Sequence, residues 1–326
     1  MLTRRLLLCG AAAFGTAAAT GPLHAQSYPN RTVRIVVPFP PGGPTDVIAR
    51  VVAERLQASL GETVIVESRP GGAGGTVGAK AVAASTPDGY TLLFALVGTL
   101  TIAPAIFKNS GYDPLKNFAP VAMIATGAQV LAINPSLPVK TLKELVAYAK
   151  ANPGKVSYCS PGFGTQPHLL GEMFRSVTGA NIVHVPYKGS APAVTDLLAG
   201  QVQMMFDAPT TLGPHIKSGK LIGLSVSTDK RIAVLPDIPT TAEAGYPQLA
   251  ATLWGGIVAP AGTPAPIIAK LNAAINAGLK SEELRANFAR FALEPDIKSP
   301  EEFASFLAAE VTKWRKVVDD AGIKGQ

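Results

Sequence analysis

Two glycine-rich segments of the sequence have the residue types and spacing of anion-binding loops. Val36-Val37 leads into Pro41-Gly42-Gly43-Pro44-Thr45-Asp46, and Tyr158-Cys159 leads into Pro161-Gly162-Phe163-Gly164-Thr165. Each segment joins a predicted strand to a predicted helix. A helix start offers unpaired backbone N–H groups and the positive end of the helix dipole, so it can hold an anion without a charged side chain. Capture of a small carboxylate is the chemistry expected of the pair, although either loop alone could be a plain strand–helix turn.

Alternating strands and helices must position these loops. Apolar and β-branched runs predict strands at 32–37, 63–67, 90–95, 130–133, 155–159, 182–185, 202–206, 221–226 and 253–259. Amphipathic stretches predict helices at 46–60, 76–84, 141–151, 191–199, 210–218, 264–279, 282–291 and 300–321, and one that ends near 177. This alternation predicts an α/β fold with largely parallel sheets. Ligands of open α/β sheets lie at the carboxyl ends of strands, where both glycine loops fall.

The first 25 residues are predicted to be a secretory signal peptide. Arg4 and Arg5 precede an apolar, alanine-rich stretch, and Leu23-His24-Ala25 has the small-residue spacing of a cleavage site. We therefore expect cleavage after Ala25 and export to the periplasm. The arginine pair fits a general secretory signal and a twin-arginine signal equally well.

About 300 residues remain. A single hydrophobic core usually supports fewer residues than this, so two lobes are expected. The predicted boundaries put residues 26–126 and 251–326 in lobe 1 and residues 127–250 in lobe 2. Three stretches without charge, 89–107, 118–139 and 244–269, are interrupted by proline and glycine. They are predicted to be buried strands with loops and not membrane spans.

Composition and motifs disfavour several other functions. Removal of Arg4 and Arg5 lowers the net charge from +7 to +5, and the basic residues are scattered, so no nucleic acid is expected as a partner. The sequence lacks a dinucleotide fingerprint, a P-loop and a nucleophile elbow, and its histidines lack metal-ligand spacing. We therefore expect no cofactor, no metal and no catalysis. The alternative is a hydrolase that uses Cys159 or His168.

Several segments, in order along nearly the whole chain after residue 25, resemble the Bug-type receptors of tripartite tricarboxylate transporters. The resemblance rests on Val36-Val37-Pro38-Phe39-Pro40-Pro41-Gly42-Gly43 with Asp46, Glu67-Ser68-Arg69-Pro70-Gly71-Gly72-Ala73-Gly74-Gly75, Pro87-Asp88-Gly89-Tyr90-Thr91-Leu92-Leu93, His184-Val185-Pro186-Tyr187-Lys188-Gly189, Phe206-Asp207, Gly219-Lys220-Leu221, Leu235-Pro236-Asp237-Ile238-Pro239-Thr240 and Ala259-Pro260-Ala261-Gly262-Thr263-Pro264.

The resemblance implies a type II periplasmic binding protein fold, in which two crossing strands join two α/β lobes and the ligand lies in the cleft between them. It also implies a carboxylic acid ligand held by loop backbone, hydroxyl groups and ordered water. The family's binding positions fall on Phe39, Pro41, Gly42, Gly43 and Asp46 in the first loop, and on Ser160, Gly162, Gly164, Thr165 and His168 in the second. As alternatives, Asp46 stabilises the first helical turn and His168 caps or packs.

Three further residues are predicted beside the cleft. Tyr187 and Lys188 either contact the ligand or only shape a strand end, and Lys188 could pair with the ligand carboxylate or with Asp207. Asp207 ends a strand, where it is expected to accept a hydrogen bond from a ligand amine or hydroxyl, or to hold a loop. An acidic residue there disfavours a second carboxylate nearby.

The expected function is that of a monomeric receptor that closes by hinge motion around a small organic acid and delivers it to integral membrane transporter subunits. A sensor that reports its ligand to a membrane kinase is the alternative. The sequence leaves aromatic acids, amino acids, citrate-like acids and nicotinate-like acids open as ligands.

Overall fold

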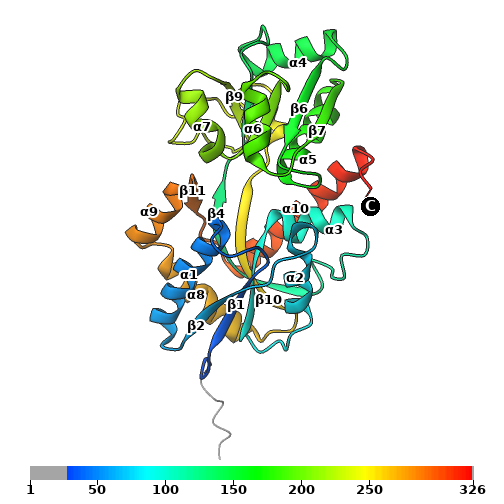
Figure 1. Ribbon diagram of the computed structural model, residues 1–326. Coiled ribbons are helices and arrows are strands. Elements are labelled where there is room, and N and C mark those ends of the chain that lie inside the picture. Colours follow the sequence, from blue (N-terminus) through cyan, green and yellow to red (C-terminus); the bar gives the residue numbers. More distant parts are fainter. Residues whose placement is uncertain (1–27, 325–326) are drawn as a thin grey trace, which may run out of the picture.

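The computed structural model describes residues 28–324, which form two α/β lobes stacked end to end (Figure 1). One lobe is built on a six-stranded sheet and the other on a five-stranded sheet. The prediction of a two-lobed α/β protein is confirmed. The predicted signal segment and its cleavage site lie outside the described residues.

Lobe 1 is a sheet covered by helices on both faces. The strand order is β11 (Leu293–Pro295), β4 (Phe118–Gly127), β10 (Leu253–Pro260), β3 (Thr91–Leu96), β1 (Val33–Val37) and β2 (Val64–Ser68). One face packs against α1 (Pro44–Leu60), α8 (Ala265–Gly278) and α9 (Glu282–Arg290). The other packs against α2 (Thr76–Ala83), η2 (Gly98–Ile102), α3 (Ala103–Ile106) and α10 (Pro300–Asp320). The short helix η1 (Ala73–Gly75) lies between β2 and α2.

Lobe 2 repeats this arrangement on a smaller scale. Its strand order is β7 (Ile182–Pro186), β6 (Val156–Ser160), β8 (Met204–Asp207), β5 (Val130–Ile133) and β9 (Ile222–Val226). Helices α4 (Leu142–Ala151) and α5 (Gln166–Thr178) cover one face, and α6 (Ser190–Leu198) and α7 (Pro209–Lys217) cover the other. The short helix η3 (Pro247–Leu249) precedes the return to lobe 1.

The sheets are mixed, so the expectation of largely parallel sheets is wrong. The strands that carry the glycine loops are parallel, since β1 pairs with β2 and β3, and β6 pairs with β7 and β8. The strands that connect the lobes break the pattern, because β4 leads toward lobe 2 while β10 returns from it, and the two pair antiparallel. β5 likewise pairs antiparallel with β8 and β9.

The three charge-free stretches are buried parts of the two lobes. They contain β3 with η2 and α3, then β4 with β5, and finally η3, β10 and the start of α8. The sequence predicted strands and loops there but not the helical turns of η2 and α3. Within residues 28–324, no helix combines the length and hydropathy needed to cross a membrane.

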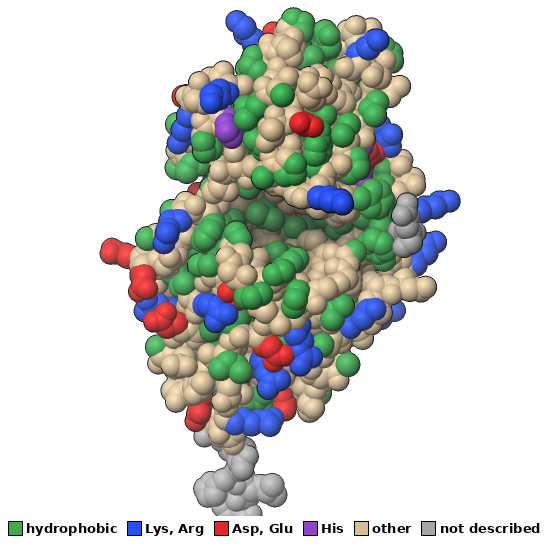
Figure 2. Space-filling view, in the orientation of Figure 1, with side chains coloured by type: hydrophobic (Ala, Val, Ile, Leu, Met, Phe, Trp, Pro, Cys, Tyr) green, Lys and Arg blue, Asp and Glu red, His purple; other side chains and the backbone are tan. Residues whose placement is uncertain are grey.

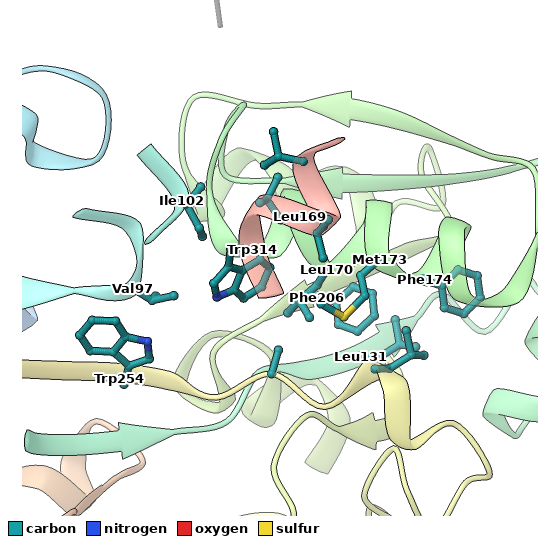
Figure 3. Packing of buried hydrophobic residues seen from close by; sticks show 14 of the residues in the cluster. Val97, Ile102, Leu131, Leu169, Leu170, Met173, Phe174, Phe206, Trp254 and Trp314 are labelled. Atoms are coloured by element: carbon teal, nitrogen blue, oxygen red, sulfur yellow. The ribbon is translucent and has the colours of Figure 1, made fainter. Parts of the chain in front are cut away.

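One hydrophobic cluster runs through both lobes. It contains Val97 and Ile102 of lobe 1, Leu169 and Leu170 of α5 in lobe 2, and Trp314 of α10 between them (Figure 3). Helix α10 starts in lobe 1 and its last turns pack against α5 (Figure 1). The C-terminal helix therefore joins the lobes in addition to the two crossing segments.

Hydrogen bonds tie the two crossing segments to each other. The backbone N–H of Gln129 donates to Oγ of Ser227 at 2.9 Å, and the Ser227 hydroxyl donates to the Ala251 carbonyl at 2.6 Å. The backbone of Ser227 also bonds to Gln129 and to Ala251. The outgoing and returning chains are thus joined into one narrow belt between the lobes.

Candidate functional site

The two glycine loops lie at the sheet edges that face each other across the gap between the lobes. Because β1, β2 and β3 are parallel, their carboxyl ends share one edge, and the same holds for β6, β7 and β8. Figure 2 shows the molecule hollowed between these edges, with hydrophobic side chains on the walls and a cationic side chain at the upper lip. A Cβ atom added to Gly164 would lie 3.3 Å from Ile106 in α3, so the edges nearly touch at one side.

The helices that start at these edges lack capping side chains. No side chain accepts a hydrogen bond from the first turn of α1, α5, α6 or α7. Thr141, Ser281 and Ser299 cap α4, α9 and α10, whereas α2 and α8 also start without a capping side chain. The amide groups of α1 on one wall and of α5 on the other are therefore left for another acceptor, and the helix dipoles favour an anion there.

Asp46 holds the first glycine loop. It is buried, and its Oδ2 accepts hydrogen bonds from the Gly42 amide at 3.0 Å and from Nε of Arg50 at 2.9 Å. Arg50 also donates to Oδ1 at 3.1 Å. The hydrogen bond from Arg50 holds the pKa of Asp46 below its usual value. Both oxygens are thus engaged within the loop, which supports the alternative that Asp46 stabilises the first helical turn.

The other first-loop residues surround the start of α1. Phe39 packs half-buried against the lobe 1 core, whereas Pro41 and Gly42 are exposed and Gly43 precedes the helix. Gly42 has φ +84°, a backbone conformation that suits glycine.

The second loop is held by hydrogen bonds among its own residues. Oγ of Ser160 lies 2.7 Å from Nε2 of His184 and 3.1 Å from the Gly162 carbonyl, and the Thr165 hydroxyl donates to the same carbonyl at 2.7 Å. The Gly164 amide donates to Nδ1 of His168 at 3.1 Å, so in the neutral ring the proton sits on Nε2. Ser160 and His168 are buried, and they shape the loop from beneath.

Four rings stack behind this loop, from the surface into the lobe. Ring centroids of Phe163 and His168 are 4.9 Å apart, those of His168 and His184 4.1 Å, and those of His184 and Tyr158 4.7 Å. Phe163 is 51% exposed, whereas Tyr158 is fully buried and donates to Glu172 at 2.6 Å. Burial lowers the pKa of His168 to about 3 and that of His184 to about 4, so both rings are neutral at pH 7.

The absence of a side chain at Gly171 leaves space for the ring of Tyr158 in this stack. A Cβ atom on Gly171 in α5 would lie 2.1 Å from Cε2 of Tyr158, inside the ring's own volume. We expect Gly171→Ala to displace Tyr158 and lower the free energy of unfolding by about 2 kcal/mol. Gly213→Ala is the matched control, since its Cβ would meet nothing closer than 3.9 Å, and it should stabilise α7 by up to about 1 kcal/mol. Urea unfolding of both variants measures the effect, and a stabilised Gly171→Ala would contradict it.

The remaining predicted residues line the same edge of lobe 2. Tyr187 is half-buried, and its hydroxyl donates to Oδ2 of Asp196 at 2.6 Å, while Lys188 is exposed. Within residues 28–324 no ion pair joins Lys188 to Asp207. The Ala208 amide donates to Oδ1 of Asp207 at 2.7 Å, but the buried Oδ2 lacks a hydrogen bond of normal geometry. Burial raises the pKa of Asp207, and the Ser190 hydroxyl and the Ala208 amide oppose that rise.

Sequence reasoning missed His184 as part of this site and assigned no role to the ring of Phe163. His184 lies on β7, 24 residues from Ser160, and comes beneath the loop because Tyr158 pairs with His184 in register. No sequence motif shows that register. Cys159, the candidate nucleophile, is fully buried, and burial raises its pKa to about 12, so its thiol is protonated and out of reach.

Comparisons with known proteins find relatives that match nearly the whole chain. A family model described as tripartite tricarboxylate transporter family receptor matches residues 48–323. The protein BugT of Bordetella pertussis is 41% identical over 324 residues, 99% of each chain. A Rhodopseudomonas palustris protein solved with adipate is 36% identical, with 91% of this chain and 99% of that one covered and a TM-score of 0.75. MatC of the same organism, solved with bound malate, is 34% identical, with coverage of 89% and 100% and a TM-score of 0.72.

Proposed function

The chain belongs to the tripartite tricarboxylate transporter receptor family, whose members are periplasmic solute-binding proteins, and we propose that it captures a small organic acid between its two lobes. The observation that carries the proposal is the pair of uncapped helix starts, α1 on one wall and α5 on the other. Each offers backbone amides and a positive dipole end to a carboxylate. The adipate and malate bound by two relatives are ligands of this class.

The proposed binding site uses backbone more than charge. Gly43 and the first turn of α1, and the first turn of α5, supply the amides. The amides of Gly42, Gly162, Gly164 and Thr165 are bonded within the loops, so these residues shape the backbone that the ligand approaches. Phe39 and Pro41 supply apolar wall on one side. Asp46, Ser160 and His168 hold the two loops in shape from behind. Tyr187 shapes the strand end beside Lys188.

Asp207 and Lys188 are proposed to set ligand preference. Apart from the nearby Ser190 hydroxyl, the buried Oδ2 of Asp207 has no donor with normal hydrogen-bond geometry, and a ligand hydroxyl or amine can supply one. The exposed Lys188 can approach a carboxylate at the cleft rim without being buried. A ligand with a hydroxyl or amine next to its carboxylate therefore fits this wall better than one with a second carboxylate there.

Export and delivery complete the proposed function. Residues 1–25 are proposed to act as a signal peptide cleaved after Ala25, and the mature protein is proposed to work as a monomer that hands its ligand to integral membrane transporter subunits. Purification of the tagged, ligand-loaded protein from solubilised membranes tests the partner. Recovery of a permease supports the proposal, whereas recovery of a kinase supports the sensor alternative.

A thermal-shift screen of organic acids tests ligand capture directly. The panel contains adipate, malate, succinate, benzoate, nicotinate, citrate and amino acids. A ligand at 100 times its dissociation constant stabilises the folded state by about 2.7 kcal/mol, which raises Tm by about 4 °C in a protein of this size. Malate should outperform succinate, which lacks the hydroxyl, and Asp207→Asn should reduce that preference. A panel in which no acid raises Tm would overturn the proposal.

A further inference from the structure

A cavity of about 510 Å³ lies behind the crossing strands, on the side away from the glycine loops. In lobe 1, β4 and β10 separate the edge strand β11 from β3, β1 and β2. In lobe 2, β5 separates the edge strand β9 from β8, β6 and β7. The glycine loops follow β1 and β6, whereas the cavity is walled by β11 and by the loop that follows β9. The cleft and the cavity therefore lie on opposite sides of the crossing segments.

The cavity is formed by three parts of the chain. Thr126, Gly127, Ala128 and Thr252 of the crossing segments form its floor. Residues 228–234 of lobe 2 form one wall, and the segment from Ala289 to Lys298 with Phe306 of lobe 1 forms the other. None of the thirteen residues proposed to hold or shape the ligand site lines it.

The two walls make their polar contacts within their own lobes. Arg231 pairs with Glu243 at 2.9 Å in lobe 2, and Lys298 pairs with Asp296 at 2.6 Å in lobe 1. Among residues 28–324, no hydrogen bond or ion pair joins the 228–234 wall to the opposite wall. The walls can therefore move apart without breaking a polar contact.

The belt of Gln129, Ser227 and Ala251 lies on the axis about which the lobes rotate in such a movement. Because the two crossings are bonded to each other, they turn as one, and the packing of α10 against α5 is the second contact through which the rotation axis must pass. Rotation of one lobe about a pivot moves its two sides in opposite directions, so closure of the cleft in front must widen the cavity behind.

We propose that the cavity is a control site coupled to the ligand cleft, in which any group that holds its walls apart favours the closed, ligand-binding state. The coupling rests on the proposed function only in that the cleft closes around an acid. A group that fits the widened cavity better than the narrow one shifts the population toward closure by that difference in free energy. Apparent affinity rises with the fraction of molecules that are already closed.

Side-chain wedges test this coupling from both walls. Ala289→Trp adds bulk from lobe 1, and Ala233→Trp adds it from lobe 2, and both residues line the cavity. Ala286→Trp is the control, since Ala286 is also exposed on α9 but does not line the cavity. Circular dichroism confirms that each variant is folded. Small-angle X-ray scattering of the ligand-free proteins and calorimetric titration with the best acid from the panel are the two measurements.

Both wedges should reduce the radius of gyration of the ligand-free protein and lower the dissociation constant for the acid by about tenfold, while the control changes neither. Unchanged or weaker binding by both folded wedges, with wild-type binding intact, overturns the coupling and leaves the proposed function standing. If no acid binds even wild type, the scattering alone decides, because the contraction needs no ligand.

Discussion

Replacement of Trp314 by alanine is expected to lower the free energy of unfolding by about 4 kcal/mol, the range observed when a fully buried tryptophan is truncated. Trp314 is fully buried in the cluster that runs through both lobes, where Ile102 lies on one side and Leu169 on the other (Figure 3). Its Nε1 donates to Oε2 of Glu310 at 3.0 Å. The substitution therefore leaves a cavity between the lobes and removes one donor from a buried carboxylate.

Urea unfolding at pH 7 measures this effect. Trp314→Phe is the matched control, because it keeps most of the ring volume and loses the N–H donor, which should cost about 1–2 kcal/mol. Glu310 retains the Nε1 donor of Trp254 at 3.0 Å in both variants. A loss below 1 kcal/mol for Trp314→Ala would show that α10 does not hold the lobes together through this side chain.

Acidification from pH 7 to pH 4 is expected to remove about 4 kcal/mol of stability through the stacked pair of His168 and His184. Their folded pKa values of about 3 and 4 lie below the ordinary value of 6.5. As the pH falls below 6.5, the unfolded chain binds protons that the folded protein cannot. Each pH unit then costs about 1.4 kcal/mol per histidine, and the figure of about 4 allows for water at the half-buried His184.

The stability that the neutral pair contributes is thus complete above pH 6.5 and declines as the pH falls toward the folded values. Urea unfolding at pH 7, 6, 5 and 4 follows the decline. The control is the double variant His168→Gln, His184→Gln, which has uncharged amides at both positions and should show a smaller loss over the same range. An equal loss in wild type and double variant would place the acid sensitivity elsewhere.

The alternation of strands and helices and both glycine loops could be predicted because they depend on local sequence. Strand runs, the capping box at Ser299 and the glycine turns each act within a few residues. The direction of β4 and β10 could not, since it follows from how the lobes are connected. The short strand β11 lacks the length of apolar sequence that marks a strand.

The positions of the two loops were predictable, whereas the contacts that support them were not. The residues of both loops are where the sequence placed them, at facing strand ends. The roles of Asp46 and His168 became visible only with their partners, Arg50 and the Gly164 amide. The ring stack depends on the pairing of β6 with β7, a contact between segments that have no common sequence signal.

The position of α10 has a consequence for the order in which the chain folds. The apolar face of α5 is complete by residue 178, but α10, which packs against it with Trp314 beside Leu169 (Figure 3), is the last helix. During synthesis that face stays exposed until nearly the whole chain is available. The second lobe therefore completes its core last and with help from the first, and the two lobes fold and unfold as one cooperative unit.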